Sequence, residues 1–447
     1  MSASGTHFVD QDSPFAVPGE LDLFSIPPTQ LGVQASHWVN VRPKNVVDDG
    51  GPWLFELQTG PHYCLPCRNY LVLRLKLERK GNGVPIDLVA ADVVAPINKI
   101  ASTLIRSLKV YLGSKMISDS SELYAYRSIL ETELNFGYDV KESGHLTAAL
   151  YARNSPSGLW DDVGNLGFDL RRKWFAGGEI EVLAPLTCDL FNTRKVLPSH
   201  SNLRVEISRN NDDFLITSHN AADAVGRAYH LRVVDLSWQV QMLELSKTAS
   251  LAIETALLKT PAKYPLRLVR MGRLSIPRGS NRSPLNAVMC GQIPRRLIVG
   301  AVSRKAFNGD RVLDPFRFKH FNCSEISITA GGVQYPREPL RMNYEKDQYL
   351  GAYISFLENL GLGSPSNQAV QIHPEAYKQG LCLYAFDLSS DQTADGSHWD
   401  LSRQGSVTID AHFSTPLTED IELIIYAEQD SSLLIDAHRE PHLTHMI

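Results

Sequence analysis

The sequence predicts an all-β protein built from two tandem antiparallel sandwiches, with short helices in the loops and a helix between the two halves. Three observations support this fold class. Many short segments alternate apolar and polar residues, which is the period of a half-buried strand. Glycine-rich turn signals separate these segments. Several features of the first half also recur, in the same order, in the second half.

Length and composition fit a two-domain globular protein. The chain has 447 residues, which suits two units of roughly 200 residues each. Its formal net charge of −5 argues against a chain whose main task is to bind nucleic acid, so we expect no sequence-specific nucleic-acid binding. We also expect no secretory signal, and no membrane span, because no apolar run approaches 18 residues.

Residues 1–35 are rich in Ser, Pro and Gly and have no lasting periodicity, so they are predicted to form an extended N-terminal arm. A disordered terminus is one interpretation. The other is an arm that docks on a neighbour or under its own domain. We favour docking, because one short segment is too apolar for a solvated tail. It contains Leu21, Leu23, Phe24 and Ile26.

The first sandwich is predicted over 36–243. Leucines alternate with polar residues along the strand Tyr70–Glu78, and Gly113-Ser114 forms the turn of a hairpin within Leu108–Ser118. A helix over Ser121–Leu134 follows, with Asp119 in a capping box. Its residues Leu123, Tyr126, Leu130 and Leu134 fall on one apolar stripe. Residues 138–178 are predicted to be a long surface loop. Further strands are expected at Ile180–Leu186, Leu203–Ile207 and 234–242.

A linker helix is predicted within 244–262, centred on Ser250–Lys259, and the second sandwich over 263–435. Gly331-Gly332 forms its hairpin turn, and Pro336 is expected to stop the return strand. The polar tail, 436–447, is expected to be solvated and mobile. The other elements expected are strands at Leu266–Ile276, Leu381–Leu388, Ser406–Phe413 and Ile421–Glu428, and a helix carrying Leu350, Tyr353, Leu357 and Leu360 that ends at Gly361.

The internal repeat makes the architecture more specific. The hairpin glycines Gly113 and Gly331 lie 218 residues apart, and the helix-terminal glycines Gly137 and Gly361 lie 224 apart. Two further features occur once in each half: an Asp-Leu pair that follows an apolar strand, and a strand in which apolar and polar residues alternate. Each half thus has the strands and turns for two four-stranded sheets, so we predict two eight-stranded jelly rolls. The Asp-Leu pairs are Asp189-Leu190 and Asp387-Leu388, and the alternating strands are 203–207 and 407–411.

Candidate metal sites are weak. Cys64 and Cys67 form a single Cys-x-x-Cys motif near His62, but zinc needs four ligands, so buried thiols are the expected state. The tail has helical metal-ligand spacing in its three histidines, but a solvated terminus is favoured. These histidines are His438, His442 and His445.

Catalytic and charged clusters are equally weak. Asp161-Asp162 and Asp212-Asp213 lie in polar segments and are expected to be solvated loops. Arg171-Arg172-Lys173 and Arg295-Arg296 are expected to lie on solvated faces, although nucleic acid or a neighbour's acidic edge are alternatives. No lipase-like serine motif or phosphate-binding loop occurs. We therefore predict no catalytic residue, no cofactor and no metal.

Five blocks of sequence occur in order at 20–30, 185–192, 299–300 with 306–309, 314–316 and 426–428. Together they resemble one known family, the major capsid proteins of Polinton/Maverick elements and the related adintoviruses. The resemblance extends from about residue 20 to residue 436. It implies a double jelly roll with both barrels upright on a shell, a trimer that forms a pseudo-hexagonal capsomer, and no catalytic residues. The tail after Asp436 has no counterpart.

The expected function is that of a major capsid protein whose homotrimers tile an icosahedral shell around double-stranded DNA. Its partners would be further copies of itself, penton proteins and other minor capsid proteins. Its location would be the virion, after assembly in the host nucleus. A double-jelly-roll carbohydrate-active or amidase enzyme is the alternative, and it needs convergent carboxylates between the barrels. A lectin-like module is a third, marked by loop aromatics such as Trp160 and Trp174.

Overall fold

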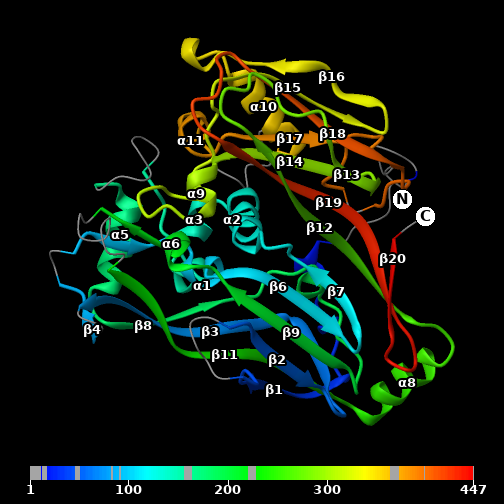
Figure 1. Cartoon of the computed structure of the whole chain (residues 1–447). Helices are drawn as coiled ribbons and strands as arrows, with labels where there is room; N and C mark the ends of the chain where they lie inside the picture. Colours follow the sequence, from blue (N-terminus) through cyan, green and yellow to red (C-terminus); the bar gives the residue numbers. More distant parts are fainter. Residues whose placement is uncertain are drawn as a thin grey trace.

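Strands dominate the computed structural model of the chain (Figure 1). It describes residue 12 and residues 18–45, 51–81, 84–89, 92–155, 164–219, 228–362, 372–396 and 398–445. Three residues considered above, Trp160, Asp161 and Asp162, lie outside these ranges.

The first barrel consists of two facing antiparallel sheets, which Figure 1 shows in blue to green. The first sheet has the order β1 (Val33–Val41), β11 (Tyr229–Leu245), β3 (Tyr63–Gly81) and β8 (Glu179–Ala184), and β4 (Val84–Asp87) also pairs with β3. The second has the order β2 (Trp53–Gln58), β9 (Asn202–Arg209), β6 (Ile105–Leu112) and β7 (Lys115–Asp119). A separate pair joins β5 (Val94–Pro96) and β10 (Ile216–Ser218).

The second barrel repeats this plan in green to red. One sheet has the order β12 (Ala262–Ile276), β19 (Ile421–Ile435), β14 (Arg296–Ser303) and β17 (Leu383–Asp387), and β20 (Pro441–His445) pairs with β19. The other has the order β13 (Ala287–Gln292), β18 (Gln404–Phe413), β15 (Cys323–Ala330) and β16 (Val333–Arg341).

The predicted fold class, two tandem jelly rolls, is confirmed. The hairpins β6–β7 and β15–β16 occupy the same position in their sheets, as the repeat predicted. Gly113 and Gly331 both have positive φ, at 59° and 57°, which explains why glycine stands at both turns. A helix follows each hairpin, α2 (Tyr124–Asn135) in the first barrel and α10 (Leu350–Asn359) in the second.

The remaining helices lie in the connections. They are α1 (Ile100–Thr103), α3 (Tyr138–Lys141), α4 (His145–Ala148), α5 (Leu166–Phe175), α6 (Asp212–Leu215), α8 (Lys247–Leu257), α9 (Arg304–Asn308), α11 (Pro374–Gln379) and the 3₁₀ turns Gly19–Leu21, Leu190–Asn192 and Tyr344–Lys346. The prediction of a loop over 138–178 was wrong, since it contains α3, α4 and α5. In α5, Asn165 caps the first turn and Phe168 and Phe175 are buried, so packing stabilises a helix whose sequence pattern is weak.

Pro336 does not end its strand. β16 continues to Arg341 and, among the residues that the structure describes, pairs only with β15, so it is an edge strand, where proline is tolerated. The register also shifts between Ile326 and Ile328 of β15. Proline at this irregularity costs no ladder hydrogen bond within the sheet.

The expectation of a solvated tail was wrong too. β20 pairs with the last residues of β19, with Leu443 opposite Leu433 and Pro441 opposite Ile435. Leu443 packs against the core. Polar residues flank Leu443 on both sides, which is the pattern of a half-buried strand. The tail can therefore pair with the free edge of β19 as a further strand.

Candidate functional site

The candidate functional region is the seam, which is the surface where the two barrels meet. Buried polar and aromatic side chains of both halves of the chain contact each other there. Helix α2 lies at this seam (Figure 1). Buried hydrophobic residues of both barrels form one contiguous cluster.

An ion pair on α2 is the centre of the seam. The Arg127 guanidinium is buried and donates to the Asp189 carboxylate, 2.6 Å away, and to Glu131, 2.8 Å away. Asp189, just after β8, also accepts the backbone N–H of Val269 on β12, at 3.2 Å. Burial alone would lower the pKa of Arg127, but the charges of Asp189 and Glu131 outweigh it and hold this pKa well above its usual value. One carboxylate therefore joins a helix of the first barrel to a strand of the second.

An aromatic contact lies beside this ion pair. Tyr126, the neighbour of Arg127 on α2, stacks on Phe307 with ring centroids 5.6 Å apart and meets Phe316 edge-on at 5.4 Å. Both phenylalanines belong to the second half of the chain. Phe214, from α6, completes the cluster at 6.2 Å from Tyr126. Helix α2 of the first barrel thus inserts an aromatic ring among those of the second.

Further polar contacts fix the barrels together around the rim of the seam. Asp213 pairs with Arg311 at 2.9 Å, and Tyr264 donates to the backbone carbonyl of Val196 at 2.7 Å. Arg439, before β20, binds Glu254 of α8 at 2.6 Å and the carbonyl of Ser199 at 2.8 Å. These contacts join residues of the two halves at several separate points.

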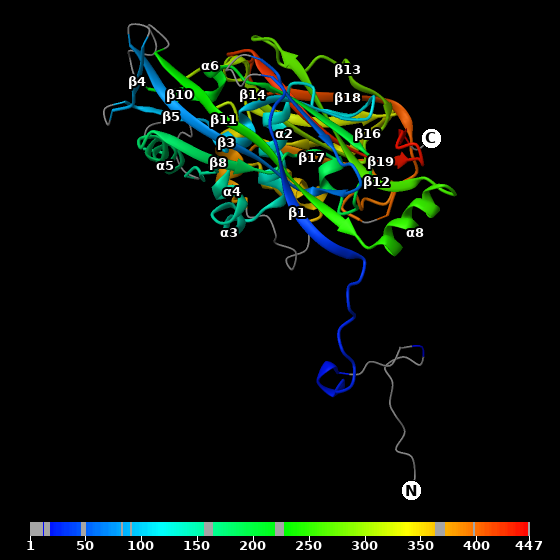
Figure 2. The ribbon, with the colours of Figure 1, turned by 90° about the horizontal axis from the view of Figure 1, so that it is seen from below.

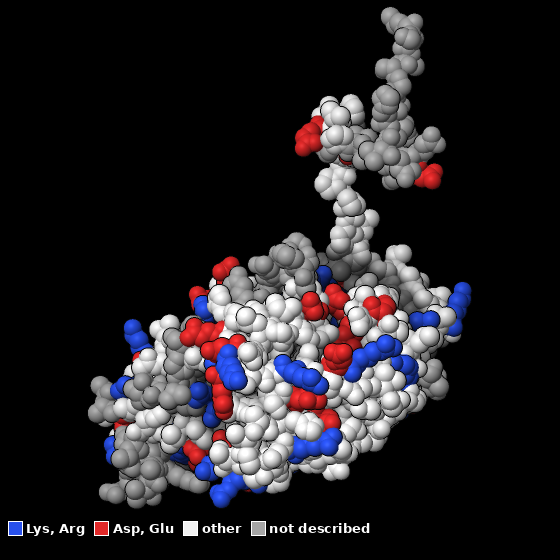
Figure 3. Space-filling model, turned by 90° about the horizontal axis from the view of Figure 1, so that it is seen from above, with Lys and Arg blue, Asp and Glu red and all other residues white. Residues whose placement is uncertain are grey.

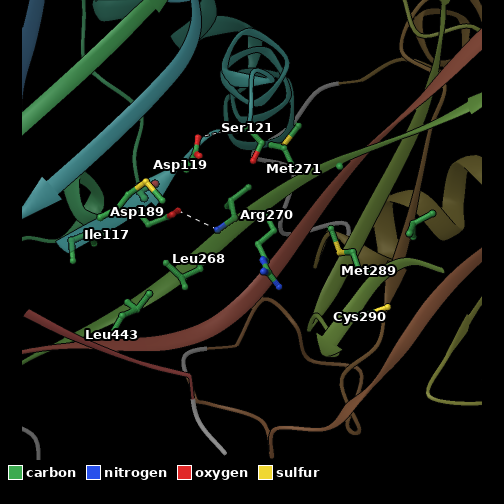
Figure 4. A pocket seen from close by; sticks show the side chains of 15 residues that line it. Ile117, Asp119, Ser121, Asp189, Leu268, Arg270, Met271, Met289, Cys290 and Leu443 are labelled. Carbon is green, nitrogen blue, oxygen red and sulfur yellow. Dashed lines mark hydrogen bonds between the residues drawn. The ribbon is translucent and has the colours of Figure 1, made fainter. Parts of the chain in front are cut away.

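A groove of about 530 Å³ opens at this seam between two sheet edges, β7 of the first barrel and β12 of the second. Figure 4 shows Asp189 bonded to the backbone of β12, with Met289 and Cys290 of β13 on the opposite wall. Methionines contribute much of the apolar lining: Met116, Met271 and Met289. A second hollow of about 520 Å³ shares Ser121, Met271 and Gly272 with it.

The groove does not have the convergent carboxylates that the enzyme alternative requires. Of its two carboxylates, Asp189 is neutralised by Arg127, and Asp119 accepts the backbone N–H of Ser121 at 2.9 Å. Both therefore hold structure. The lectin-like alternative gains nothing from Trp174, which packs against the core.

His62, Cys64 and Cys67, considered above as a weak candidate for a metal site, do not converge among the described residues. Cys64 is buried, and burial, reinforced by the Cys67 thiol, raises its pKa to about 12, so it stays a thiol. In the described part of the chain, the potential ligands that do converge are Asp436, Glu440 and His442, with ligand atoms within 4.8 Å of one another. The Asp436 carboxylate already accepts the backbone N–H groups of His438 and Glu440. The absence of a bound metal therefore stays a prediction.

The charged clusters are more buried than predicted. Arg295 donates to Asp430 at 3.2 Å and to the carbonyl of Thr393 at 2.6 Å, and Arg296 pairs with Glu428 at 2.9 Å. The prediction that Arg295 and Arg296 lie on a solvated face was therefore wrong, because carboxylates of β19 neutralise both charges. Arg171 is also buried and donates to the carbonyl of Pro96 at 2.9 Å.

Asp212-Asp213 is not a solvated loop either. Asp212 begins α6 and pairs with Arg209 at 2.6 Å and with His230. Its neighbour pairs with Arg311 across the seam, as described above. Sequence reasoning noticed Asp189 only as part of the repeat and Tyr126 only as part of a helical stripe. No sequence signal marks their partners in the second barrel.

Comparisons with known proteins support the fold. No protein-family model matches the chain. An uncharacterised protein of Caenorhabditis elegans, F54H12.2, is 28% identical over 426 residues, covering 93% of this chain and 99% of the relative. Within the described residues, no helix is long and apolar enough to cross a membrane.

Solved structures from viruses share the fold at low sequence identity. A chain of the Sputnik virophage has a TM-score of 0.64 at 11% identity, covering 100% of this chain and 95% of its own. The PBCV-1 capsid gives 0.59 at 11%, with 94% and 99% covered, and the mavirus major capsid protein gives 0.53 at 9%, with 99% and 97% covered. The PBCV-1 and mavirus structures are those of viral capsid proteins. The chain thus has the double jelly-roll fold of viral major capsid proteins.

Proposed function

We propose that this protein is a structural major capsid protein whose homotrimers form pseudo-hexagonal capsomers and tile an icosahedral shell around double-stranded DNA. The Polinton and adintovirus resemblance of the sequence makes such an element or virus the proposed source. The barrels at 36–243 and 263–435 are the proposed repeating units. One observation carries the proposal: two barrels of identical strand order are locked to each other through Asp189.

The physical argument rests on symmetry. Three copies of a chain with two similar barrels present six similar units around one axis, which suits a hexagonal lattice. A fixed angle between the barrels is needed for this, because a flexible seam would give capsomers of variable shape. The buried contacts of Arg127 and Tyr126 supply that rigidity.

Surface charge agrees with a shell role. The face seen in Figure 3 mixes Lys and Arg with Asp and Glu and has no large area of one sign. A surface of this kind suits contacts between protein subunits, with DNA neutralised by other, basic proteins. Penton and minor capsid proteins are proposed to complete the shell in the host nucleus, and the virion is the proposed location.

The test is the mass and shape of the purified protein. Light scattering should give three times the chain mass of 49.7 kDa. Negative-stain microscopy should show hexagonal particles whose outline fits a ring of six barrels. A protein that stays monomeric at high concentration and forms no hexagonal particles would contradict the proposal.

A further inference from the structure

We infer that the apolar N-terminal segment Leu21–Ile26 of one copy binds in the groove between the barrels of a second copy. The inference deepens the proposed function and rests on it, because it names the surface by which one subunit of a capsomer or shell holds the next. It starts from two features that the single chain leaves without a partner.

The first feature is the arm. Its described residues extend away from the barrels in Figures 2 and 3. Four apolar side chains are exposed: Leu21 by 67%, Leu23 by 76%, Phe24 by 94% and Ile26 by 86%. Burial of such side chains contributes about 1.5–3 kcal/mol each. An exposed apolar run of this size is typical of a segment that binds another surface.

The second feature is the groove and the two sheet edges beside it. In the described part of the chain, β12 pairs only with β19 and β7 only with β6, so each strand has an unpaired edge toward the groove. The N–H of Val269 points away from β19, since it binds Asp189, and alternation gives the N–H and C=O of Met271 the same direction. The N–H and C=O of Met271 can pair with an added strand, whereas the N–H of Val269 stays bonded to Asp189.

The groove lining suits an apolar ligand. Met116 is 49% exposed, and Met271 and Met289 are partly exposed. Methionine side chains are flexible and adapt to apolar partners such as leucine and phenylalanine. The groove therefore offers apolar contacts along its walls and backbone hydrogen bonds along its edges.

Charge identifies the arm as the occupant. The first 41 residues carry four carboxylates, Asp10, Asp12, Glu20 and Asp22, and no lysine or arginine. The exposed Arg270 and Arg273 line the two hollows, and neither forms an ion pair with a described residue. Asp119 and Glu122 are the opposing charges, but Glu122 already pairs with Arg106 at 2.8 Å. Arg270 and Arg273 therefore give the acidic arm two positive charges with which it can pair.

Reach and geometry favour a second copy over the same chain. The 14 residues from Gly19 to Gly32 span up to about 46 Å when extended, and they point away from their own barrels. In the free arm, Asp22 accepts the backbone N–H of Ser25 at 3.1 Å. Docking as a strand opens this small turn and replaces its hydrogen bonds with those of the β7 and β12 edges.

The native Cys290 provides a test, because its exposed thiol lies in the groove. One variant combines Leu23→Cys with Cys290→Ser, so its arm thiol cannot react with its own groove. After mixing with mass-tagged wild-type protein and mild oxidation, a disulfide-linked dimer of one variant chain and one tagged chain is expected. The variant alone can form only arm-to-arm dimers, which the tag distinguishes, and Thr29→Cys in place of Leu23→Cys should form the mixed dimer far less. When the partner chain keeps Cys290 but carries Arg270→Glu and Arg273→Glu, the yield of the cross-linked dimer should fall about tenfold. Adding Glu20→Lys and Asp22→Lys to the arm variant should restore this yield.

The outcomes separate this inference from the proposed function. A disulfide formed only within single chains of a Leu23→Cys variant that keeps Cys290, or no mixed dimer in any mixture, overturns the inference. Light scattering of the same samples reports the trimer independently. Trimers without the cross-link would contradict the arm contact and support the proposed function. Cross-linked copies without trimers would support the arm contact and contradict the proposed function.

Discussion

Asp189 and Val269 meet across the seam between the barrels, where the Asp189 carboxylate accepts the Val269 backbone N–H while it also binds the buried Arg127. The corresponding aspartate of the second barrel, Asp387, instead accepts the backbone N–H groups of Ser389 and Ala394 in its own loop. The repeated Asp-Leu pair thus joins the barrels in one half and shapes a loop in the other.

Asp189→Ala should lower the free energy of unfolding by about 3–5 kcal/mol, because it leaves the Arg127 charge buried without its main partner. Chemical denaturation followed by circular dichroism measures this. Glu122→Ala, which breaks the exposed pair with Arg106, is the control and should have little effect. Equal losses in both variants would show that Asp189 is not a special contact.

Tyr126 should act through its ring and not its hydroxyl. The hydroxyl is buried and has no hydrogen-bond partner among the described residues, so Tyr126→Phe should keep or raise stability. Tyr126→Ala removes the contacts with Phe307 and Phe316 and should cost about 3–5 kcal/mol. Thermal melts of the two variants provide the comparison. A large loss in Tyr126→Phe would mean that the hydroxyl has a partner.

Acid should destabilise the second barrel through His320. Burial, with a smaller effect from Lys378, lowers the pKa of His320 from 6.5 to about 4, and its Nδ1 accepts the N–H of Asn322 at 2.9 Å. Between pH 6.5 and 4 the unfolded chain binds the proton and the folded chain does not. The stabilising contribution of His320 is therefore complete above pH 6.5 and falls toward pH 4.

His320→Phe keeps a ring against Tyr344, whose centroid lies 4.2 Å from the imidazole, but cannot titrate. Its stability should depend less on pH in this window than that of the wild type, by at most about 1.4 kcal/mol per pH unit, since solvent reaches part of the ring. Denaturation series at pH 4, 5, 6 and 7 measure the difference. Parallel curves for both proteins would exclude His320 as the cause.

Deletion of residues 1–30 should weaken trimers or larger particles and leave the barrels folded. The four exposed apolar side chains of the arm make no buried contact with the barrels of their own chain. The thermal melt of the truncated monomer should therefore match that of the full chain, while light scattering should show smaller assemblies. Unchanged particles would assign the assembly contacts to the barrels alone.

The sequence by itself determined the local structure of this protein. Alternation predicted the strands, glycine predicted both hairpin turns, and the order of the repeats predicted two similar barrels, because these signals depend on neighbours in the chain. The stripe on α2 also identified Tyr126 as buried. It did not identify the surface that covers it, since Phe307 and Phe316 lie in the other half of the sequence.

Only the tertiary structure decided which charges are buried. Arg296 was predicted to be solvated, yet Glu428, 132 residues further along the chain, neutralises it inside the second barrel. Arg127 and Asp189 likewise meet over 62 residues. A charged side chain is buried when folding brings it an opposite charge, and no local pattern contains the position of that partner. The tail strand β20 has the same origin, because the free edge of β19 that recruits it exists only in the folded barrel.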